Sequence, residues 1–438
     1  MEDLPLLRLK IGMRCPVDAI VSAGHAYFRF IKRKKFAKIR HMFAFPKIEK
    51  VTRDATIVHF FLLFGYKIFS LYFPLYLVSR NFSLPEVGYT YLLIYLPIVV
   101  FSPFVGFLSH KINPALLASV GISGYGIYAL GMIFVQNPVL FYLCQVLLGI
   151  SAALFFVATR AILMGSYLEN PDRAFGWFYS APFYADAVAP AVGAFFIWQF
   201  GFVGVFVFSL ILQFICAIFC YSTLKKQSEP LLDGGFNHRD ARENYSTVLR
   251  IIKSGRVLPF ALVSLSVLFL AGFYRAFFVL FLKDELFWSQ GLILVFISLV
   301  SVLFLPLSLF LIRQLGRSSS ERNIVRGGLV SGGLSVLFGA MLPALNFLMV
   351  LLIDLGRLVS SLICNAGRSG LISRSLKEKP EEAGAIDTVF APLGVALGAF
   401  VSGLIIVPLG YGFLFILGGV LICLISLSVR FVKKENLM

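Results

Sequence analysis

The sequence predicts an all-α integral membrane protein, with twelve transmembrane helices in two pseudo-symmetric six-helix bundles around a central cavity. The first observation is composition: 59% of the 438 residues are hydrophobic and 14% are charged, with a mean hydropathy of +0.88. Soluble domains carry about 25% charged residues, so this chain is not an ordinary globular protein. The other two observations are a set of long apolar runs and a constant offset of 208 residues between the two halves.

Twelve apolar runs approach the length of about 20 residues that a helix needs to cross a hydrocarbon core of about 30 Å. Lipid offers the backbone no hydrogen-bond partners, so these runs are expected to be helices. The runs are 55–79, 86–109, 113–135, 138–160, 174–198, 201–223, 257–282, 290–312, 325–343, 345–369, 384–408 and 410–431. They predict an N-terminal bundle over 55–223 and a C-terminal bundle over 257–431.

The offset of 208 residues recurs in three separate segments, which indicates a duplication. The matching pairs are Tyr66-Lys67 with Tyr274-Arg275, Ser123-Gly124 with Ser331-Gly332, and Arg160 with Arg368. Internal repeats are typical of secondary transporters, which bind their ligand near the bilayer midplane where the repeats meet. The repeat therefore predicts a transporter with a central site.

The net charge of +17 is distributed unevenly among the loops. With a cytoplasmic N-terminus, most Lys and Arg residues fall on the cytoplasmic side: in 1–54, 224–256, 313–326, 368–379 and 430–434, and at Lys111, Arg160 and Arg173. The opposite side holds only Arg80 and Lys283. The positive-inside rule then predicts two cytoplasmic termini in a multi-pass protein of the cell membrane. The same distribution argues against a nucleic-acid partner.

Three segments are expected outside the helices. Residues 1–54 read as a basic cytoplasmic tail, which either lies on the anionic inner leaflet at about 1 kcal/mol per base or lacks fixed structure. A third interpretation is an upstream extension, with Met42 as the true start. Residues 224–256 are expected to form a flexible cytoplasmic connector, and 432–438 a short cytoplasmic tail.

The six cysteines are scattered, and five of them fall inside expected helices. No CxxC pair or Cys/His cluster occurs, so the sequence supports neither a disulfide framework nor a zinc site. We expect no metal and no other cofactor.

Twelve helices in two related sixes, with cytoplasmic termini and a long central loop, resemble the major facilitator superfamily over about residues 55–434. Between its second and third helices the family carries Gly-x-Leu-x-Asp-Arg-x-Gly-Arg. Here stand Gly106, Leu108, His110, Lys111 and Asn113, so His110 replaces the acid. The resemblance implies a gating loop that contains Gly106, His110 and Lys111.

The fifth expected helix resembles that of exporters in the same family, which carries Gly-x-x-x-Gly-Pro-x-x-Gly-Gly. This chain has Ala185, Ala189, Pro190, Gly193 and Ala194. The resemblance implies an exporter of amphipathic or drug-like compounds. The alternative interpretation is a tight helix interface made of small residues and bent by the proline.

Five ionisable residues fall well inside expected helices: Lys67, Asp186, Arg275, Asp354 and Arg357. Each costs about 2.5–3.5 kcal/mol at a helix centre, so such residues usually have a function. The family resemblance implies that these residues face a central cavity. Three bases against two acids make that cavity slightly positive, which favours an anionic substrate.

Lys67 and Arg275 are repeat mates and predict a clamp for an anion between the two halves. A similar pair of bases, one from helix 1 and one from helix 7, occurs in organophosphate/phosphate antiporters of this superfamily. The guanidinium fork suits carboxylate or phosphate, and Tyr66 and Tyr274 are candidate hydrogen-bond partners for the substrate. The competing interpretation is that the long basic side chains snorkel to the membrane surface.

Asp354 and Arg357 stand at positions i and i+3 and therefore share one helix face. They either neutralise each other or contact the substrate, with Asp354 taking up a proton or ion. Asp186 is expected either to pair with Lys67 or to act as a second proton-coupling site with a raised pKa.

The sequence thus predicts a secondary active transporter that moves a small organic or phosphate-like anion across the bilayer by alternating access, working as a monomer. The first alternative is the exporter described above. A second alternative, from a different class, is a non-transporting sensor on a transporter scaffold. An enzyme is not expected, because the histidines lie in no HExxH motif and neither GxSxG nor GxxxxGK occurs in a suitable context.

Overall fold

The computed structural model describes residues 47–70, 73–79, 82–135, 137–228, 243, 245–247, 250, 253 and 257–435. By its internal contacts the chain divides into two compact units, Met1–Lys47 and Ile48–Met438, and the description below concerns the second unit. The predictions for the tail 1–54 and the connector 224–256 fall largely outside the described residues, as does the end of the tail 432–438.

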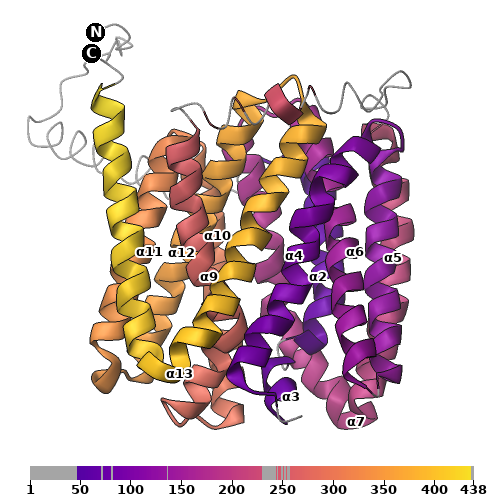
Figure 1. Ribbon diagram of the computed structural model, residues 1–438. Helices are drawn as coiled ribbons and strands as arrows, with labels where there is room; N and C mark the ends of the chain where they lie inside the picture. The colour runs from indigo at the N-terminus through magenta and orange to yellow at the C-terminus, as the bar shows by residue number, and fades with distance from the viewer. Residues whose placement is uncertain are drawn as a thin grey trace, which may run out of the picture. The chain divides into compact units, whose positions relative to one another are not determined.

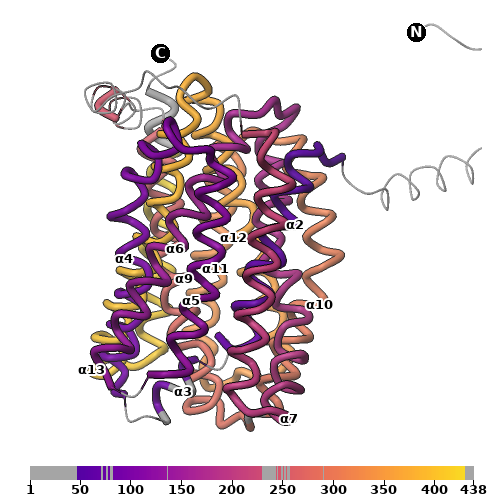
Figure 2. Tube along the Cα trace, turned by 90° about the vertical axis from the view of Figure 1, so that its right-hand side faces the viewer, coloured from indigo at the N-terminus to yellow at the C-terminus, as the bar shows by residue number. Residues whose placement is uncertain are grey.

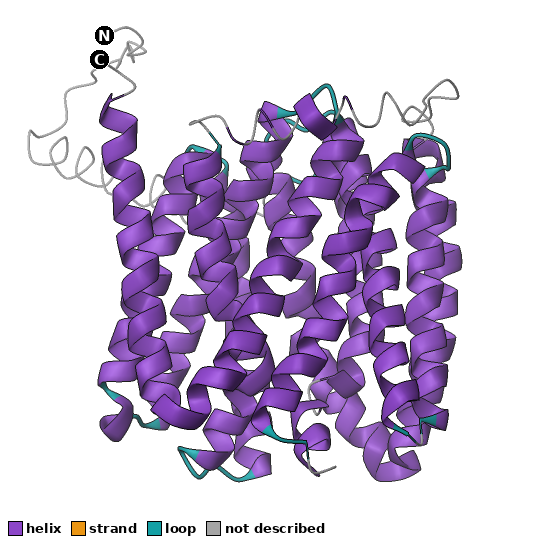
Figure 3. Ribbon diagram, viewed as in Figure 1, coloured by secondary structure: helices purple, strands orange, loops and turns teal. Residues whose placement is uncertain are grey.

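Among the described residues every regular element is a helix, and the long helices run roughly along one common direction (Figure 1, Figure 3). In chain order the elements are α2 Lys50–Ser70, α3 Phe73–Ser79, α4 Leu84–Ser109, α5 Pro114–Phe134, α6 Pro138–Gly165, α7 Pro171–Ser228, α9 Leu258–Asp284, α10 Gln290–Leu315, α11 Ser320–Ala340, the 3-10 turn Leu342–Ala344, α12 Phe347–Ser375 and α13 Pro380–Glu435. The all-α prediction is confirmed.

Local sequence sets many of the helix starts. The side chains of Asn113, Asn137, Ser289, Ser319 and Asn346 each accept a hydrogen bond from a backbone amide in the first turn that follows. Such caps satisfy amides that have no partner within the helix. Proline follows directly after the cap of α5 and of α6, where its missing N–H costs nothing.

Two of the elements, α7 and α13, are each a pair of helices joined at one glycine. Gly201 in α7 has φ 66° and Gly410 in α13 has φ 74°. Glycine adopts this left-handed region without the penalty that a Cβ imposes. The turns lie close to the predicted breaks, after residue 198 in the first half and after residue 408 in the second.

Among the described residues, eight helices are long and apolar enough to cross a membrane. They are α4, α5, α6, α7, α9, α10, α12 and α13, with α7 and α13 each counted once. The predicted number was twelve. The elements α2 and α11 are absent from the eight because α2 carries several charged residues and α11 mixes its apolar residues with Gly and Ser.

Two helices extend well beyond the predicted apolar runs. The sequence predicted helix ends at residues 160 and 369, whereas α6 continues to Gly165 and α12 to Ser375. The sequence counted Arg160 and Arg368 among the basic residues of the cytoplasmic side, at the predicted helix ends. The structure places both inside helices, with relative exposures of 3% and 1%. The length of an apolar run underestimates the length of a helix when the last turns of that helix bury polar side chains against other polar side chains.

Elements from the two halves of the sequence pack directly against each other. The α4 helix lies beside α13, and α7 lies beside α10 and α12 (Figure 1, Figure 2). Within the first half α2 packs so closely on α7 that a Cβ at Gly193 would collide with the backbone carbonyl of Ile68. Ala185 and Ala189 of the same α7 segment are fully buried. This packing accounts for the small residues of the fifth predicted helix.

Candidate functional site

The first candidate residue, Lys67, lies in α2 and forms an ion pair with Asp186 of α7. Its ammonium group also donates to the backbone carbonyl of Pro182 at 3.1 Å. The two charged side chains are 18% and 28% exposed, so both are only partly buried by the protein. Of the two predicted roles for Asp186, pairing with Lys67 is the arrangement observed.

Arg275 of α9 points towards helices of the first half. Its Nη1 donates a hydrogen bond of 2.8 Å to Tyr95 Oη in α4, and the guanidinium lies 5.7 Å from the centre of that ring. It also interacts electrostatically with Tyr66 and Asp186. The side chain is exposed, and no carboxylate forms an ion pair with it among the described residues. The hydrogen bond to α4 directs the Arg275 side chain across to the first half in this conformation.

Among the described residues Asp186 forms an ion pair with Lys67 only, but its charge also acts on Arg275, and the charges of Lys67 and Arg275 lie close enough to repel each other. Tyr66 lies beside them, with its ring edge-on to Tyr125 at 5.6 Å between ring centres. Repulsion between two bases raises the free energy of the empty site, and an anion between them relieves it.

The predicted pair in α12 is observed as an ion pair. Arg357 Nε lies 2.6 Å from Asp354 Oδ1, and its guanidinium stacks on the ring of Tyr274 at 3.9 Å from the ring centre. Asp354 and Tyr274 are buried, and the Arg357 side chain is 18% exposed. The charges of this pair are satisfied locally, in agreement with the self-neutralising interpretation.

Sequence analysis missed a buried cluster centred on Asp387 of α13. Asp387 is completely buried, and Arg368 Nε of α12 donates to its Oδ1 at 2.9 Å. Arg160 Nε of α6 lies 3.3 Å from Oδ2, which also accepts from Ser369 Oγ at 2.7 Å and Tyr179 Oη at 3.2 Å. The cluster therefore contains two arginines and one carboxylate.

The repeat relates the members of this cluster. Arg160 and Arg368 are 208 residues apart, and so are Tyr179 and Asp387. The arginine match was visible in the sequence, but both residues had been placed at helix ends. Asp387 lies near the start of the predicted run 384–408 and was not among the five ionisable residues identified inside expected helices.

A second group of contacts joins the predicted gating loop to the start of α13. His110 Nε2 lies 3.1 Å from Glu382 Oε1, and both residues are buried. A Cβ at Gly106 would collide with Tyr245 Oη and with Ala385. The acid missing from the loop is thus present on the opposite helix. Lys111 is exposed and lies over the ring of Phe107 at 5.0 Å.

Potential metal ligands occur in this group as well. His110, Glu381 and Glu382 bring one ligand-type atom each to within 4.8 Å of one another. All three also take part in other interactions. The histidine stands 271 or more positions before the two acids in the sequence, so no local motif predicted that the three residues would lie together.

The start of α7 makes the corresponding contacts in the other half. Asp172 is completely buried, accepts from Ser320 Oγ at 2.8 Å and Asn323 Nδ2 at 3.0 Å, and pairs with Arg374 at 2.5 Å. These partners come from α11 and α12. Contacts between first-half and second-half elements therefore occur near the starts of both α7 and α13.

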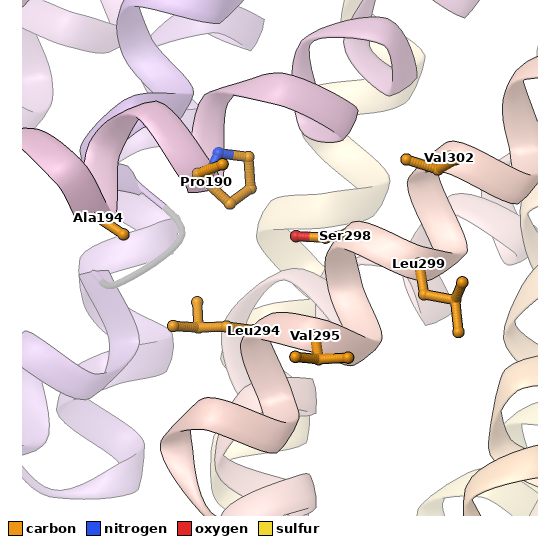
Figure 4. Close-up of a pocket in the computed structure, with 8 residues that line it drawn as sticks. Pro190, Ala194, Leu294, Val295, Ser298, Leu299 and Val302 are labelled. Carbon is orange, nitrogen blue, oxygen red and sulfur yellow. The ribbon is translucent and has the colours of Figure 1, made fainter.

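An apolar groove lies between α7 and α10, with a volume of about 380 Å³ (Figure 4). It is lined by Pro190, Ala191, Ala194, Leu294, Val295, Ser298, Leu299 and Val302. Pro190 stands one helical turn beyond Asp186 in α7, on nearly the same face. Closer to the start of α7, Phe183 packs on Phe304 of α10 with 4.5 Å between ring centres.

The chain resembles known membrane transporters. A family model described as Major Facilitator Superfamily matches residues 55–372. No curated protein matches the chain in a sequence search.

Solved structures share the fold at low sequence identity. The human organic anion transporter MFSD10 (TETRAN) matches with a TM-score of 0.64 and 15% identity, over 86% of this chain and 99% of that one. A POT family transporter in complex with a thioalcohol conjugated peptide matches with a TM-score of 0.64 and 15% identity, over 88% and 96%. A POT family transporter in complex with 5-aminolevulinic acid matches with a TM-score of 0.65 and 14% identity, over 88% and 96%.

Proposed function

The chain belongs to the Major Facilitator Superfamily and is a membrane transporter, and we propose that it carries a small organic or phosphate-like anion by alternating access. The observation that carries this proposal is Arg275. It is an arginine deep within a long apolar helix, directed at the opposite half and paired with no carboxylate among the described residues. A charge at such a position is costly unless a ligand or an acid neutralises it.

In the proposed cycle the anion binds between Arg275 and Lys67. The guanidinium donates two parallel hydrogen bonds to a carboxylate or phosphate, which is the geometry that arginine favours. The anion also competes with Asp186 for Lys67. Asp186 then loses its counter-charge and takes up a proton, which couples the transport of the anion to protons.

We further propose twelve crossings in two bundles, with both termini in the cytoplasm of a cell-membrane protein. Each half of α7 and of α13 crosses once, and α2 and α11 add the two crossings that composition alone does not identify. Their charged and small residues would face other helices rather than lipid. The contacts of Asp172 and Glu382 would then close the cytoplasmic face in this conformation.

A thermal-shift screen of the purified protein tests the substrate class, because a ligand that binds the folded state raises its unfolding temperature. The panel contains organic acids, sugar phosphates, inorganic phosphate and hydrophobic cations. Anions should stabilise the wild type, and Lys67→Ala or Arg275→Ala should abolish that stabilisation. Lys283→Ala, which removes the other base of α9, is the matched control and should respond like the wild type.

The exporter remains a second candidate because of the groove between α7 and α10. Its lining is almost entirely apolar, and it begins one turn from Asp186. Hydrophobic cations that stabilise the wild type, with no response to any anion, would replace the anion proposal with export of amphipathic compounds. Efflux of neutral hydrophobic compounds that survives Lys67→Ala would support the same conclusion.

A further inference from the structure

We propose that Arg160 is a second anion-binding residue. In this conformation the carboxylate of Asp387 lies at Arg160, and when the two halves separate the acidic group of the transported anion takes its place. This inference rests on the proposed anion transport, but it concerns a different part of the molecule. The ligand chemistry is a carboxylate or a phosphate, since both present oxygen atoms to a guanidinium.

The charges of the buried cluster do not balance. Arg160, Arg368 and Asp387 are at most 4% exposed, so two cations share one anion away from water. Removing a charge from water costs several kcal/mol unless an opposite charge and hydrogen bonds compensate it. The excess positive charge requires either a function or a second anion.

The excess charge resides on Arg160. Arg368 donates to Asp387, Ser264, Asn365 and Tyr179 through all three of its nitrogen atoms. Among the described residues, Arg160 donates one hydrogen bond, from Nη1 to Thr388 Oγ1 at 2.5 Å. Its Nε lies 3.3 Å from Asp387 but outside hydrogen-bond geometry, and this buried atom has no hydrogen-bond partner in the part of the chain that the structure describes.

Connectivity determines which arginine loses the carboxylate. Arg368 and Asp387 both belong to the second half of the chain, on α12 and α13, so they stay together when the halves move apart. Arg160 lies on α6 and touches the second half through Asp387 and Thr388. Separation at this level therefore leaves Arg160 without an acid. The aromatic rings of Phe156 and Tyr179, 5.4 and 5.6 Å from its guanidinium, belong to its own half and remain.

The position of Arg160 suits a second anion-binding site along a transport path. Lys67 is seventeen residues from the start of α2 at Lys50, and Arg160 is five residues from the end of α6 at Gly165. At a rise of about 1.5 Å per residue, Arg160 lies roughly 18 Å closer to that end of the bundle. His59, which packs on Phe155 and Phe156, lies at an intermediate level of α2. An anion that leaves Lys67 towards this face would next meet Arg160.

Chemical rescue with acetate tests whether Arg160 accepts a free carboxylate. Asp387→Ala in the full-length purified chain removes the built-in carboxylate and should lower the unfolding temperature. Acetate, titrated to about 100 mM, should restore more than half of that loss with saturation, by the linkage between binding and stability. Sodium chloride at the same ionic strength should restore little of the loss.

The double variant Asp387→Ala/Arg160→Gln is the matched control and should show a much smaller acetate effect, because only Arg368 then remains to bind acetate. Absence of rescue in the single variant, or equal rescue in the double variant, would overturn the proposal. If Asp387→Ala does not yield folded protein, Asp387→Asn is titrated in the same way, because it preserves the size of the side chain.

A further comparison separates this inference from the proposed function. Lys67→Ala introduced beside Asp387→Ala should leave the acetate rescue unchanged, because Lys67 lies in a different charge centre. Loss of acetate rescue would then count against Arg160 alone. Anion stabilisation that survives Lys67→Ala in the otherwise unaltered chain would count against the central site alone.

Discussion

Two charge centres occupy the region where the halves of this transporter meet, and they differ in exposure and in charge balance. At the centre of Lys67, Asp186 and Arg275, the first two side chains are 18% and 28% exposed, and the arginine is exposed as well. The centre of Arg160, Arg368 and Asp387 is almost completely buried. The first centre is therefore partly exposed in this conformation, whereas the second is filled by side chains of the protein itself.

Removal of the acid should have the largest effect in the buried centre. Asp387→Ala leaves two guanidiniums without a counter-charge, and breaking a buried ion pair in this way costs about 3–5 kcal/mol. Asp186→Ala should cost clearly less, because Lys67 and Asp186 are only partly buried by the protein. Thermal unfolding of the two variants measures the difference, and equal losses would contradict the distinction between the centres.

Removal of Arg275 should affect transport strongly and stability little, the opposite of the effect expected for Asp387→Ala. Arg275→Ala should lower uptake of the anion identified by the thermal-shift screen by about 100-fold, the effect of losing a charged hydrogen-bond pair worth about 2–3 kcal/mol. The unfolding temperature should change little, since among the described residues Arg275 makes one hydrogen bond, to Tyr95. Uptake in proteoliposomes provides the measurement, with Lys283→Ala as the control. Wild-type uptake by Arg275→Ala would exclude Arg275 from the substrate site.

A matched pair of hydroxyl removals sharpens the comparison. Tyr179→Phe removes a hydroxyl that contacts Asp387, Arg368 and Ser369, and it should destabilise the protein by about 1–3 kcal/mol because it leaves buried partners unsatisfied. Tyr95→Phe removes one partner of an exposed arginine, and water can replace that partner. Thermal unfolding should rank the two losses in this order, and a larger loss for Tyr95→Phe would be inconsistent with it.

A change in salt concentration should produce the smallest effect on anion binding, and it should distinguish the two charge centres without substitution at Arg275. Raising ionic strength from about 0.1 M to 1 M shortens the screening length from about 10 Å to 3 Å, and buried pairs are screened much less than exposed charges. Anion binding at Arg275 should weaken several-fold, with sulfate avoided because it competes as an anion. The acetate rescue of Asp387→Ala should change less over the same range.

The sequence predicted the helical fold, the superfamily and the charged residues of the accessible centre. Lys67, Asp186 and Arg275 stood deep inside long apolar runs, where a charge is conspicuous. Their contacts could not be predicted, because neither the rotation of α2 against α7 nor the approach of Tyr95 to Arg275 is encoded in a local pattern.

The buried centre was missed for a physical reason. An apolar run ends where charged residues begin, so Arg160 and Arg368 were assigned to helix ends although α6 and α12 continue past them. Their burial depends on Asp387 of a third helix, α13, which is the next helix after that of Arg368 but is remote in sequence from Arg160. The partner of the predicted gating loop was missed for the same reason. His110 replaces the acid of the family motif, and its partner Glu382 comes from a helix that is remote in sequence.

The location of the single carboxylate on one half has an electrical consequence. When the halves part, Arg368 and Asp387 form a neutral unit, whereas Arg160 leaves a full positive charge on the other half. A membrane potential acts on such a charge with about 2.3 kcal/mol per 100 mV for movement through the whole field. Arg160 would traverse only a fraction of it. With the proposed orientation, an inside-negative voltage would still favour the state in which this arginine lies nearest the cytoplasm, and the transport rate would depend on voltage even for a neutral cargo.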